Sequence, residues 1–447
     1  MSKTFREWKV DQVWLLPPSV QELVPPNHVA HFVRDLVREQ LDLSDIFAAY
    51  TEERGYPPFN PAMMTALLLY AYTQGVYSSR RIARACAERV DFMAVTAMQK
   101  PDFRTVAEFR RRHLTALEGL FKQVLKLCQK AGLVKLGHVA LDGTKVKANA
   151  SKHKAMSYGR MLKAEAELQV EIARWFEEAE AADTSDDHEH RGERGDELPA
   201  WVASKEKRLE KIRVARAALE EEAAEAAKNG SAESTRGGGG RGGGGGGGGG
   251  GEVAKPKAKA QRNFTDPESR ILKVGDGFIQ GYNAQLAVDA EHQIIVAQAV
   301  FAAQVDAPFL PSIVAQIKAN IGRTPKELSA DQGYLSEANV KELKKRRVRG
   351  YISVGRQKHG SAQRSVGHHG GGFRSEHIKE MARRVSAGGF RSRYRLRKQT
   401  VEPVNGQIKE ARGFRRFSMR GAAKASGEWS LVTTAHNLLK LAKARGT

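Results

Sequence analysis

The stretch GYNAQLAVDAEHQIIVAQAVF, residues 281–301, decides the fold class of this chain. Apolar and polar residues alternate in two runs on either side of DAEHQ, and a period of two is typical of half-buried β-strands. The two runs therefore predict an antiparallel hairpin. Beyond it, the pattern predicts a helix over 308–321, a strand over 326–330, a helix that ends near Lys345 and a strand over 351–354.

Another strand is predicted ahead of the hairpin. In GHVALDGTKVKANAS, residues 137–151, the short apolar run HVAL suits a buried strand. The predicted elements follow the order strand, strand pair, helix, strand, helix, strand. This order predicts an α/β fold in which helices flank a mixed sheet. Residues 356–393 predict an irregular basic insertion, and helices over 394–412 and 428–444 close the chain.

The first part of the chain, residues 1–135, predicts an all-helical N-terminal domain. Asn60 is a good N-cap, Pro61 suits the first helical position because its missing N–H costs nothing there, and Gly75 predicts the end of that helix. The segment TVAE at 105–108 fits a capping box ahead of a long amphipathic helix.

Two of these N-terminal helices, beginning near residues 61 and 79, are joined by a short turn that is compatible with a helix-turn-helix. The second helix carries three arginines that are candidates for recognising specific DNA ends: Arg80, Arg81 and Arg84. Ordinary packing of a helical hairpin explains the same pattern, so both interpretations stay open.

A long interruption separates the strand near 140 from the hairpin. Residues 160–182 and 201–228 have helical spacing and predict a charged antiparallel helical hairpin within an insertion over 152–235. The glycine-rich range 236–262 predicts a flexible linker, because glycine loses the most entropy on ordering. RNA binding by this tract is an alternative, but two arginines without an aromatic residue favour a linker.

The charge balance points to a polyanionic partner. The 447 residues carry a formal net charge of +22, and such a field concentrates nucleic acid or an anionic surface. No apolar run approaches the roughly 20 residues of a spanning helix, and the first residues do not resemble a signal peptide. We therefore expect a cytoplasmic protein without a membrane partner. Cys86 and Cys128 lack metal-ligand spacing and predict buried free thiols.

Three acidic residues carry the functional prediction. Asp142 directly follows an apolar run, Asp331 follows the strand that ends in Ser-Ala, and Glu402 lies on the helix that begins near Tyr394. Carboxylates at strand ends face the rim of a sheet, where a substrate can reach them. Because Mg²⁺ prefers hard oxygen ligands, three such acids could hold two ions for phosphoryl transfer. A surface ion pair is the competing interpretation of Glu402.

Three motifs give the chain a family resemblance. LDGTKVKANAS around Asp142, ADQGY around Asp331 and YRLRKQTVEPVNGQIKEARGFRRF around Glu402 together resemble the DDE transposases of bacterial insertion sequences. The segments LLPPS, GYPPFNPAMMTALLLYAY and PDFRTVAEFRRRH resemble the helical N-terminal module of the same family. The resemblance implies an RNase H-like catalytic core, here residues 136–151 and 270–447, in which two Asp and one Glu bind two divalent ions, Mg²⁺ or Mn²⁺.

The family's Tyr-Arg-Glu-Lys signature maps onto the helix that carries Glu402. Its members are Tyr394, Arg397, Glu402 and Lys409. Arg397 stands one residue farther from the acid than usual, so Lys398 is the alternative residue for the arginine's place. We expect the basic and aromatic members, with three arginines that follow, to contact DNA; this set is Tyr394, Arg397, Lys398, Lys409, Arg412, Arg415 and Arg416.

The resemblance further implies a function and its partners. The expected activity is metal-dependent cleavage and strand transfer at the terminal inverted repeats of an insertion sequence, on double-stranded DNA and its target. A homodimer would bring two ends together in a synaptic complex, associated with the bacterial nucleoid when bound. The alternative is a catalytically inactive DNA-binding protein derived from a transposase, which would bind DNA in a salt-sensitive way but would not cut it.

Overall fold

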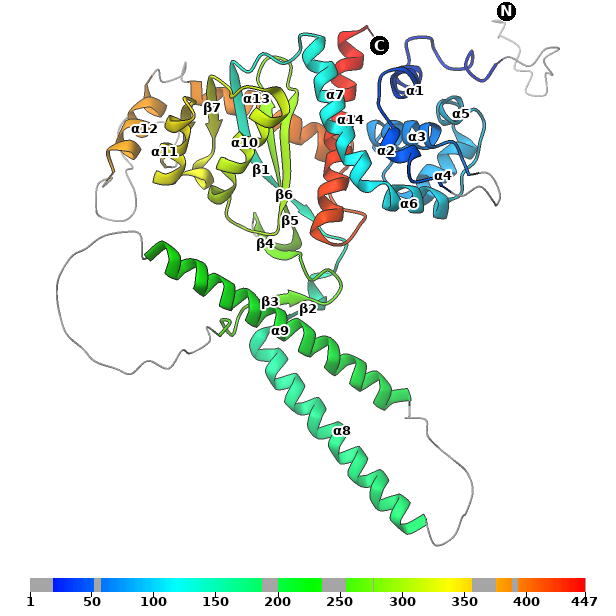
Figure 1. Cartoon of the computed structure of the whole chain (residues 1–447), viewed down its shortest axis with the longest axis vertical. Helices are drawn as coiled ribbons and strands as arrows, with labels where there is room; N and C mark the ends of the chain where they lie inside the picture. Colours follow the sequence, from blue (N-terminus) through cyan, green and yellow to red (C-terminus); the bar gives the residue numbers. More distant parts are fainter. Residues whose placement is uncertain are drawn as a thin grey trace, which may run out of the picture.

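A computed structural model describes residues 19–51, 58–186, 200–234, 255–275, 277–355, 375–387 and 393–446. Figure 1 shows a broad upper body, made of a sheet and its helices, from which a long helical hairpin projects. The predicted glycine-rich linker lies mostly outside the described residues. Its last two positions belong to a short strand, β3 (Gln261–Asn263), which pairs with β2 (Ala155–Ser157).

The central sheet is mixed, as the sequence predicts. Its strands are β1 (His138–Lys147), β4 (Arg270–Val274), β5 (Gly277–Asp289), β6 (Ile295–Phe301), β7 (Glu327–Ala330) and β8 (Arg349–Ile352). The order is β6-β5-β1-β7-β8. Strand β4 pairs with the first residues of β5, and β6 pairs with the later ones. Strand β5 runs antiparallel to β1 and β6, whereas β7 and β8 run parallel to β1. This mixed α/β arrangement agrees with the RNase H-like core that the resemblance implies.

Helices surround this sheet. They are α10 (Leu310–Ile321), α11 (Glu337–Lys345), α12 (Glu376–Ser386), α13 (Leu396–Gly406) and α14 (Ala422–Ala444). Helix α13 packs across β1, β5 and β7, and a turn of π-helix over Gln407–Ala411 follows it. The prediction of an irregular segment over 356–393 is wrong for α12. Its Met381 and Val385 are buried, and this burial stabilises the helix.

The N-terminal part is helical, as predicted. It contains α1 (Val29–Glu39), α2 (Ser44–Phe47), α3 (Pro61–Thr73), α4 (Ser79–Glu88), α5 (Val90–Thr96), α6 (Phe103–Arg112) and α7 (Leu114–Lys130). The predicted capping box at 105–108 is wrong. Asp102 caps α6 instead, because its carboxylate accepts the backbone N–H groups of Arg104 and Thr105, and the helix breaks at His113 before α7 begins.

Helix α14 joins the N-terminal helices to the sheet. It packs against α3 and α7 on one side and against β6 on the other, and Figure 1 shows it between the two halves of the body. One hydrophobic core runs through both halves, and Trp429 and His436 of α14 are fully buried in it. Burial lowers the pKa of His436 to about 3, so this histidine is a neutral core residue.

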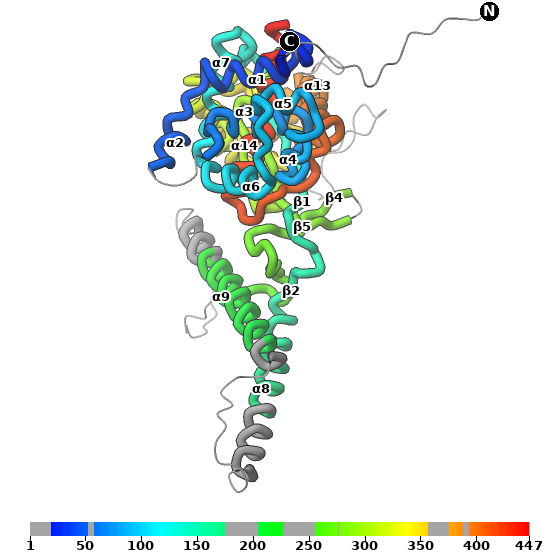
Figure 2. The backbone as a smooth tube through the Cα atoms, turned by 90° about the vertical axis from the view of Figure 1, so that its right-hand side faces the viewer, coloured from blue at the N-terminus to red at the C-terminus, as the bar shows by residue number. Residues whose placement is uncertain are grey.

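The insertion forms a helical hairpin, as predicted. Helices α8 (Tyr158–Asp186) and α9 (Ala200–Ser234) pack side by side and extend away from the body, which Figure 2 shows from a second side. A small separate core at the base of the hairpin includes Met161 and Ile212. Glu165 receives hydrogen bonds from both Arg213 and Arg216, which fasten one helix to the other.

Two further expectations concern membranes and thiols. No helix in the described part of the chain is long and apolar enough to cross a membrane. Cys86 and Cys128 are buried free thiols, as predicted, and burial raises the pKa of Cys86 to about 11. Neither cysteine therefore offers a reactive thiolate near neutral pH.

Candidate active site

The sheet places two of the three predicted acids side by side. Asp142 lies in the middle of β1, not at a strand end as the sequence suggested, because β1 continues to Lys147 by pairing with β5. Asp331 directly follows the last residue of β7. In the parallel pairing of these strands, Leu141 is opposite Ala330, so Asp142 and Asp331 are the next residues along neighbouring strands, which lie about 4.8 Å apart.

The third acid reaches the same place from α13. Arg397 is the link, because its guanidinium lies 3.4 Å from Oδ2 of Asp142 and 3.1 Å from Oε1 of Glu402. The Arg397 side chain is 13% exposed, that of Asp142 is 17% exposed and that of Glu402 is 47% exposed. Asn405, one turn after Glu402, lies 3.5 Å from Asp142 Oδ2. Glu402 therefore faces solvent at the rim while the other two groups lie deeper.

Burial and mutual repulsion set the charge state of the acids. The pKa of Asp142 is raised to about 7, first because burial disfavours its charged form. Arg397 lowers this pKa, whereas Asp331 and Glu402 raise it, so the three carboxyl groups are close enough to influence one another. Burial also raises the pKa of Asp331, and the carboxylate of Asp306 adds to that effect. Arg397 lowers the pKa of both aspartates, but burial outweighs it in each case.

Asp306 is a residue of this site that the sequence analysis did not identify. Its Oδ1 accepts hydrogen bonds from Asn283 at 2.5 Å and from Gln285 at 2.8 Å, and Lys145 Nζ lies 3.5 Å away. Asn283 and Gln285 are the polar half of the alternation in β5, yet both are fully buried. Buried polar side chains need hydrogen-bond partners. Two amide side chains two residues apart on one face of a strand were therefore the sequence signal for a polar partner such as Asp306.

Two glycines leave space for this polar cluster. A Cβ at Gly143, next to Asp142 in β1, would collide with Gln285 and stand 2.8 Å from Asp306 Oδ1. A Cβ at Gly333 would stand 3.0 Å from Asp331 Oδ1 and 3.1 Å from Asp306 Oδ2. These two glycines, in LDGTK and ADQGY, thus leave room for the side chains of Asp306 and Asp331 beside β1.

Asp289, at the end of β5, has a structural role. It is 1% exposed, and its carboxylate accepts the backbone N–H groups of Leu136 at 2.6 Å and Glu291 at 3.1 Å. It closes the end of β5 that leads into the hairpin turn. No part of this arrangement faces the acids on β1, β7 and α13.

Three of the basic residues expected to contact DNA turn inward. Besides Arg397, Lys409 donates a hydrogen bond from Nζ to the carbonyl of Lys145 at 2.9 Å, and burial lowers its pKa. Arg412 lies 3.2 Å from Nδ1 of His436. Tyr394 is half-buried beside Arg397.

The remaining predicted DNA-binding residues are exposed: Lys398, Arg415 and Arg416. Arg80, Arg81 and Arg84 are exposed on α4, with the Arg80 guanidinium 5.0 Å from the centre of the Phe103 ring. Figure 1 places α4 on the opposite side of α7 and α14 from α13. The structure therefore does not bring these three arginines to the acids.

The donor set fits a divalent cation in its chemistry. Carboxylate oxygens are the ligands that Mg²⁺ and Mn²⁺ prefer, and Arg397 already places a cation between Asp142 and Glu402. In the described residues, no group of three metal-ligating side chains is close enough to hold an ion as the side chains stand. Glu402 is the most exposed of the three groups that meet at Arg397, with 47% of its side chain exposed.

Two family models match the chain. One is described as a transposase domain (DUF772) and covers residues 18–112, which run through α6. The other is described as a transposase DDE domain and covers residues 255–438, which include Asp331 and Glu402. Asp142 lies between the two matched ranges. No curated protein and no solved structure matches the chain.

Proposed function

The chain belongs to the insertion-sequence DDE transposases, and on this premise we propose that it cuts DNA at the inverted-repeat ends of its element and joins them to target DNA. The catalytic residues in this proposal are Asp142, Asp331 and Glu402. The single observation that supports it most is the register of β1 and β7, which sets the two aspartates on neighbouring strands beneath α13. Two copies of the chain would be needed to hold two ends.

The three acids would bind two divalent cations, Mg²⁺ or Mn²⁺. Such ions supply the charge that stabilises the attacking and leaving oxygens of an in-line displacement at phosphorus. The same geometry serves both steps, since water attacks in the first and the freed 3′-hydroxyl in the second. No covalent link to the protein is required, so Tyr394 is assigned a DNA contact and not the role of a nucleophile.

The protein's own side chains would prepare the site and hold the DNA. Arg397 balances Asp142 and Glu402 before cations arrive, and it can then turn its guanidinium to a phosphate beside the scissile bond. Lys409 fixes the π-helical turn after α13 to β1 through the Lys145 carbonyl. The exposed Lys398, Arg415 and Arg416 would bind phosphates farther along the strand.

The test is strand cleavage of DNA that carries the gene with its natural flanks. With Mg²⁺ or Mn²⁺, the wild type should nick at the element ends, and Asp142→Asn, Asp331→Asn and Glu402→Gln should each lose nicking while they still bind DNA. Glu337→Gln, which removes an exposed acid on α11, is the matched control and should nick normally. If the wild type binds but does not nick with either ion, or if an acid-site variant still nicks, the catalytic proposal is wrong and an inactive DNA-binding protein remains.

A further inference from the structure

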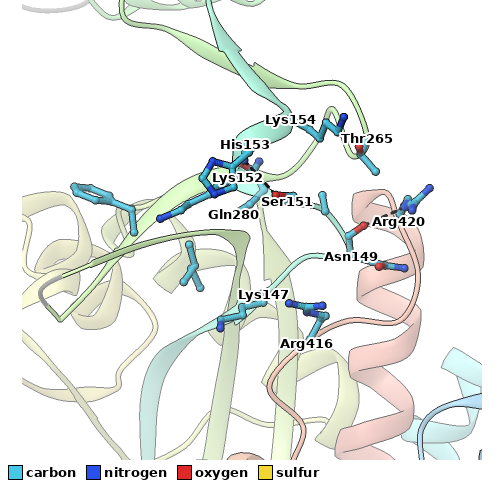
Figure 3. A pocket seen from close by; sticks show the side chains of 13 residues that line it. Lys147, Asn149, Ser151, Lys152, His153, Lys154, Thr265, Gln280, Arg416 and Arg420 are labelled. Carbon is cyan, nitrogen blue, oxygen red and sulfur yellow. Dashed lines mark hydrogen bonds between the residues drawn. The ribbon is translucent and has the colours of Figure 1, made fainter.

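A basic groove lies where the catalytic core meets the helical insertion. Its volume is about 600 Å³, and Figure 3 shows its labelled side chains around the opening. We call it the junction groove. Its basic side chains are Lys147, Lys152, Lys154, Arg416 and Arg420, together with His153, and no acidic residue lines it.

Backbone pairing explains why residues so far apart in the chain share this groove. Lys147 ends β1, and its backbone N–H and carbonyl bond to Arg415 O at 3.1 Å and to the Phe417 N–H at 2.8 Å. The segment after α13 thus continues the sheet for one bridge, with Arg416 opposite Lys147. A 3-10 turn over Lys152–Lys154 then presents three basic residues in succession.

A second groove continues the first toward the hairpin. It has a volume of about 460 Å³ and shares His153, Lys154 and Thr265 with the junction groove. The base of the hairpin adds Arg160 from α8 and Arg208 and Lys211 from α9, again without an acidic residue. The two grooves together form one basic track from the end of β1 to the insertion.

The cations of this track differ from others on the insertion. Arg213 and Arg216 pair with Glu165, and Arg262 and Arg270 pair with Glu222. By contrast, the eight Lys and Arg side chains of the track are all exposed, and none makes a salt bridge with another described residue; they are Lys147, Lys152, Lys154, Arg160, Arg208, Lys211, Arg416 and Arg420. Eight uncompensated cations repel one another, so the track favours a polyanion.

The strand itself gives the distance from the track to the acids. Asp142 and Lys147 are five residues apart in β1, which corresponds to about 17 Å at about 3.3 Å per residue. Phosphates along one strand of duplex DNA are spaced by about 3.4 Å of helix axis, so this distance matches about five nucleotides. A duplex that lies along β1 with its scissile phosphate at Asp142 would reach the junction groove half a helical turn away.

We propose that this track binds the phosphate backbone of the duplex held in the active site, beginning about five nucleotides from the cut and continuing to the base of the insertion. The inference rests on the proposed function for its reference point, the scissile phosphate. It assigns the insertion a purpose, since Arg160, Arg208 and Lys211 are presented by α8 and α9. Phosphate contacts of this kind fix register and strengthen binding without reading sequence.

The test is equilibrium binding to end DNA in EDTA, measured by fluorescence anisotropy at several salt concentrations. Two double variants remove neighbouring charges, Lys152→Gln with Lys154→Gln and Arg208→Gln with Lys211→Gln. Each should lower the salt slope by about 2, so that the ratio of wild-type to variant affinity falls about tenfold between 50 and 200 mM salt. Lys207→Gln, an exposed lysine of α9 that lines neither groove, is the control and should leave the slope unchanged.

Shortened duplexes locate the contact. On a duplex that stops about three base pairs from the cleavage site on either side, the double variants should bind as the wild type does. An unchanged salt slope on long DNA, or an equal loss on the short duplex, would overturn the proposal. Tighter binding of double-stranded RNA than of DNA, lost in the same variants, would overturn DNA as the occupant.

Cleavage separates this inference from the proposed function. The double variants, at saturating protein, should nick the short duplex as the wild type does, because that duplex does not reach the track. The four substituted side chains are exposed and lie on the turn after β1 and on α9, away from the acids' strands. If the wild type nicks and the variants bind long DNA normally, only the track is refuted. If the wild type never nicks, the proposed function fails whatever the track binds.

Discussion

Replacing Asp142 with Asn should stabilise the folded protein and abolish cleavage at once. Asp142 has a pKa of about 7 against a usual value of 3.8, chiefly because the carboxylate is buried. At 1.36 kcal/mol per pKa unit, the difference means that the folded state destabilises the charged carboxylate by about 4 kcal/mol relative to the unfolded chain. Asn removes that charge but leaves Arg397 with one partner fewer, so we expect a net gain of about 1–3 kcal/mol at pH 8.

The sign of the pH dependence follows from the direction of the shift. A raised pKa means that the folded state holds the proton more tightly, so the stability from protonated Asp142 is complete below about pH 4 and is lost as the pH rises through about 7. The Asn variant does not titrate there. Its advantage over the wild type should therefore be small near pH 4 and should grow until it levels off above about pH 7.

Thermal unfolding in EDTA at pH 5 and pH 8 measures this effect. The Asn variant should melt above the wild type at pH 8, by on the order of 2–5 °C, and the difference should shrink at pH 5. Asp45→Asn, which removes an exposed acid on α2, controls for the loss of one carboxylate. Added Mn²⁺ should raise the melting temperature of the wild type but not that of Asp142→Asn. A variant that is no more stable than the wild type at pH 8 would refute the reasoning.

The contact between the N-terminal helices and the catalytic core gives two further predictions. Glu428 is fully buried, and Arg110 lies 3.9 Å from it. Its carboxylate accepts hydrogen bonds from the N–H of Ser418 at 2.7 Å and from the Ser418 hydroxyl at 2.5 Å. Glu428→Ala should therefore cost about 3–5 kcal/mol of folding stability and lower the melting temperature sharply. Gly427→Ala would place a Cβ 2.5 Å from Leu114 Cγ and should cost about 1–3 kcal/mol of folding stability. Adding Leu114→Ala to the same chain should restore most of this loss. If thermal melts show no recovery in the double variant, the close contact between Gly427 and Leu114 is not the cause of the loss.

The periodicity of the sequence was sufficient for most of the sheet. Alternation over 281–301 predicted β5 and β6, and α10, β7, α11 and β8 followed in the predicted order, because a half-buried strand and an amphipathic helix each leave a period in the chain. Strand β4 and helix α12 were not predicted. The choice between two nearby candidates for the same helix cap was harder to predict. Asp102 and Thr105 can both cap a helix, and only the structure shows that Asp102 does so.

The site was predictable as far as the family motifs extend. Asp142, Asp331 and Glu402 were named from the sequence, but Asp306 was not, since its partners Asn283 and Gln285 look like the solvent side of an alternating strand. The sequence also could not choose a partner for a long basic side chain. Arg397 was expected on a phosphate and instead pairs with two carboxylates, a choice that depends on the register of β1 and the packing of α13.

The central claim is that three distant acids share divalent cations at the edge of one sheet. A crystal soaked in Mn²⁺ and measured at a wavelength where manganese scatters anomalously would test it most directly. We predict anomalous density contacted by the carboxylates of Asp142 and Asp331, with Glu402 turned from Arg397 toward it. Manganese density elsewhere, with these three side chains left as they stand around Arg397, would contradict the account.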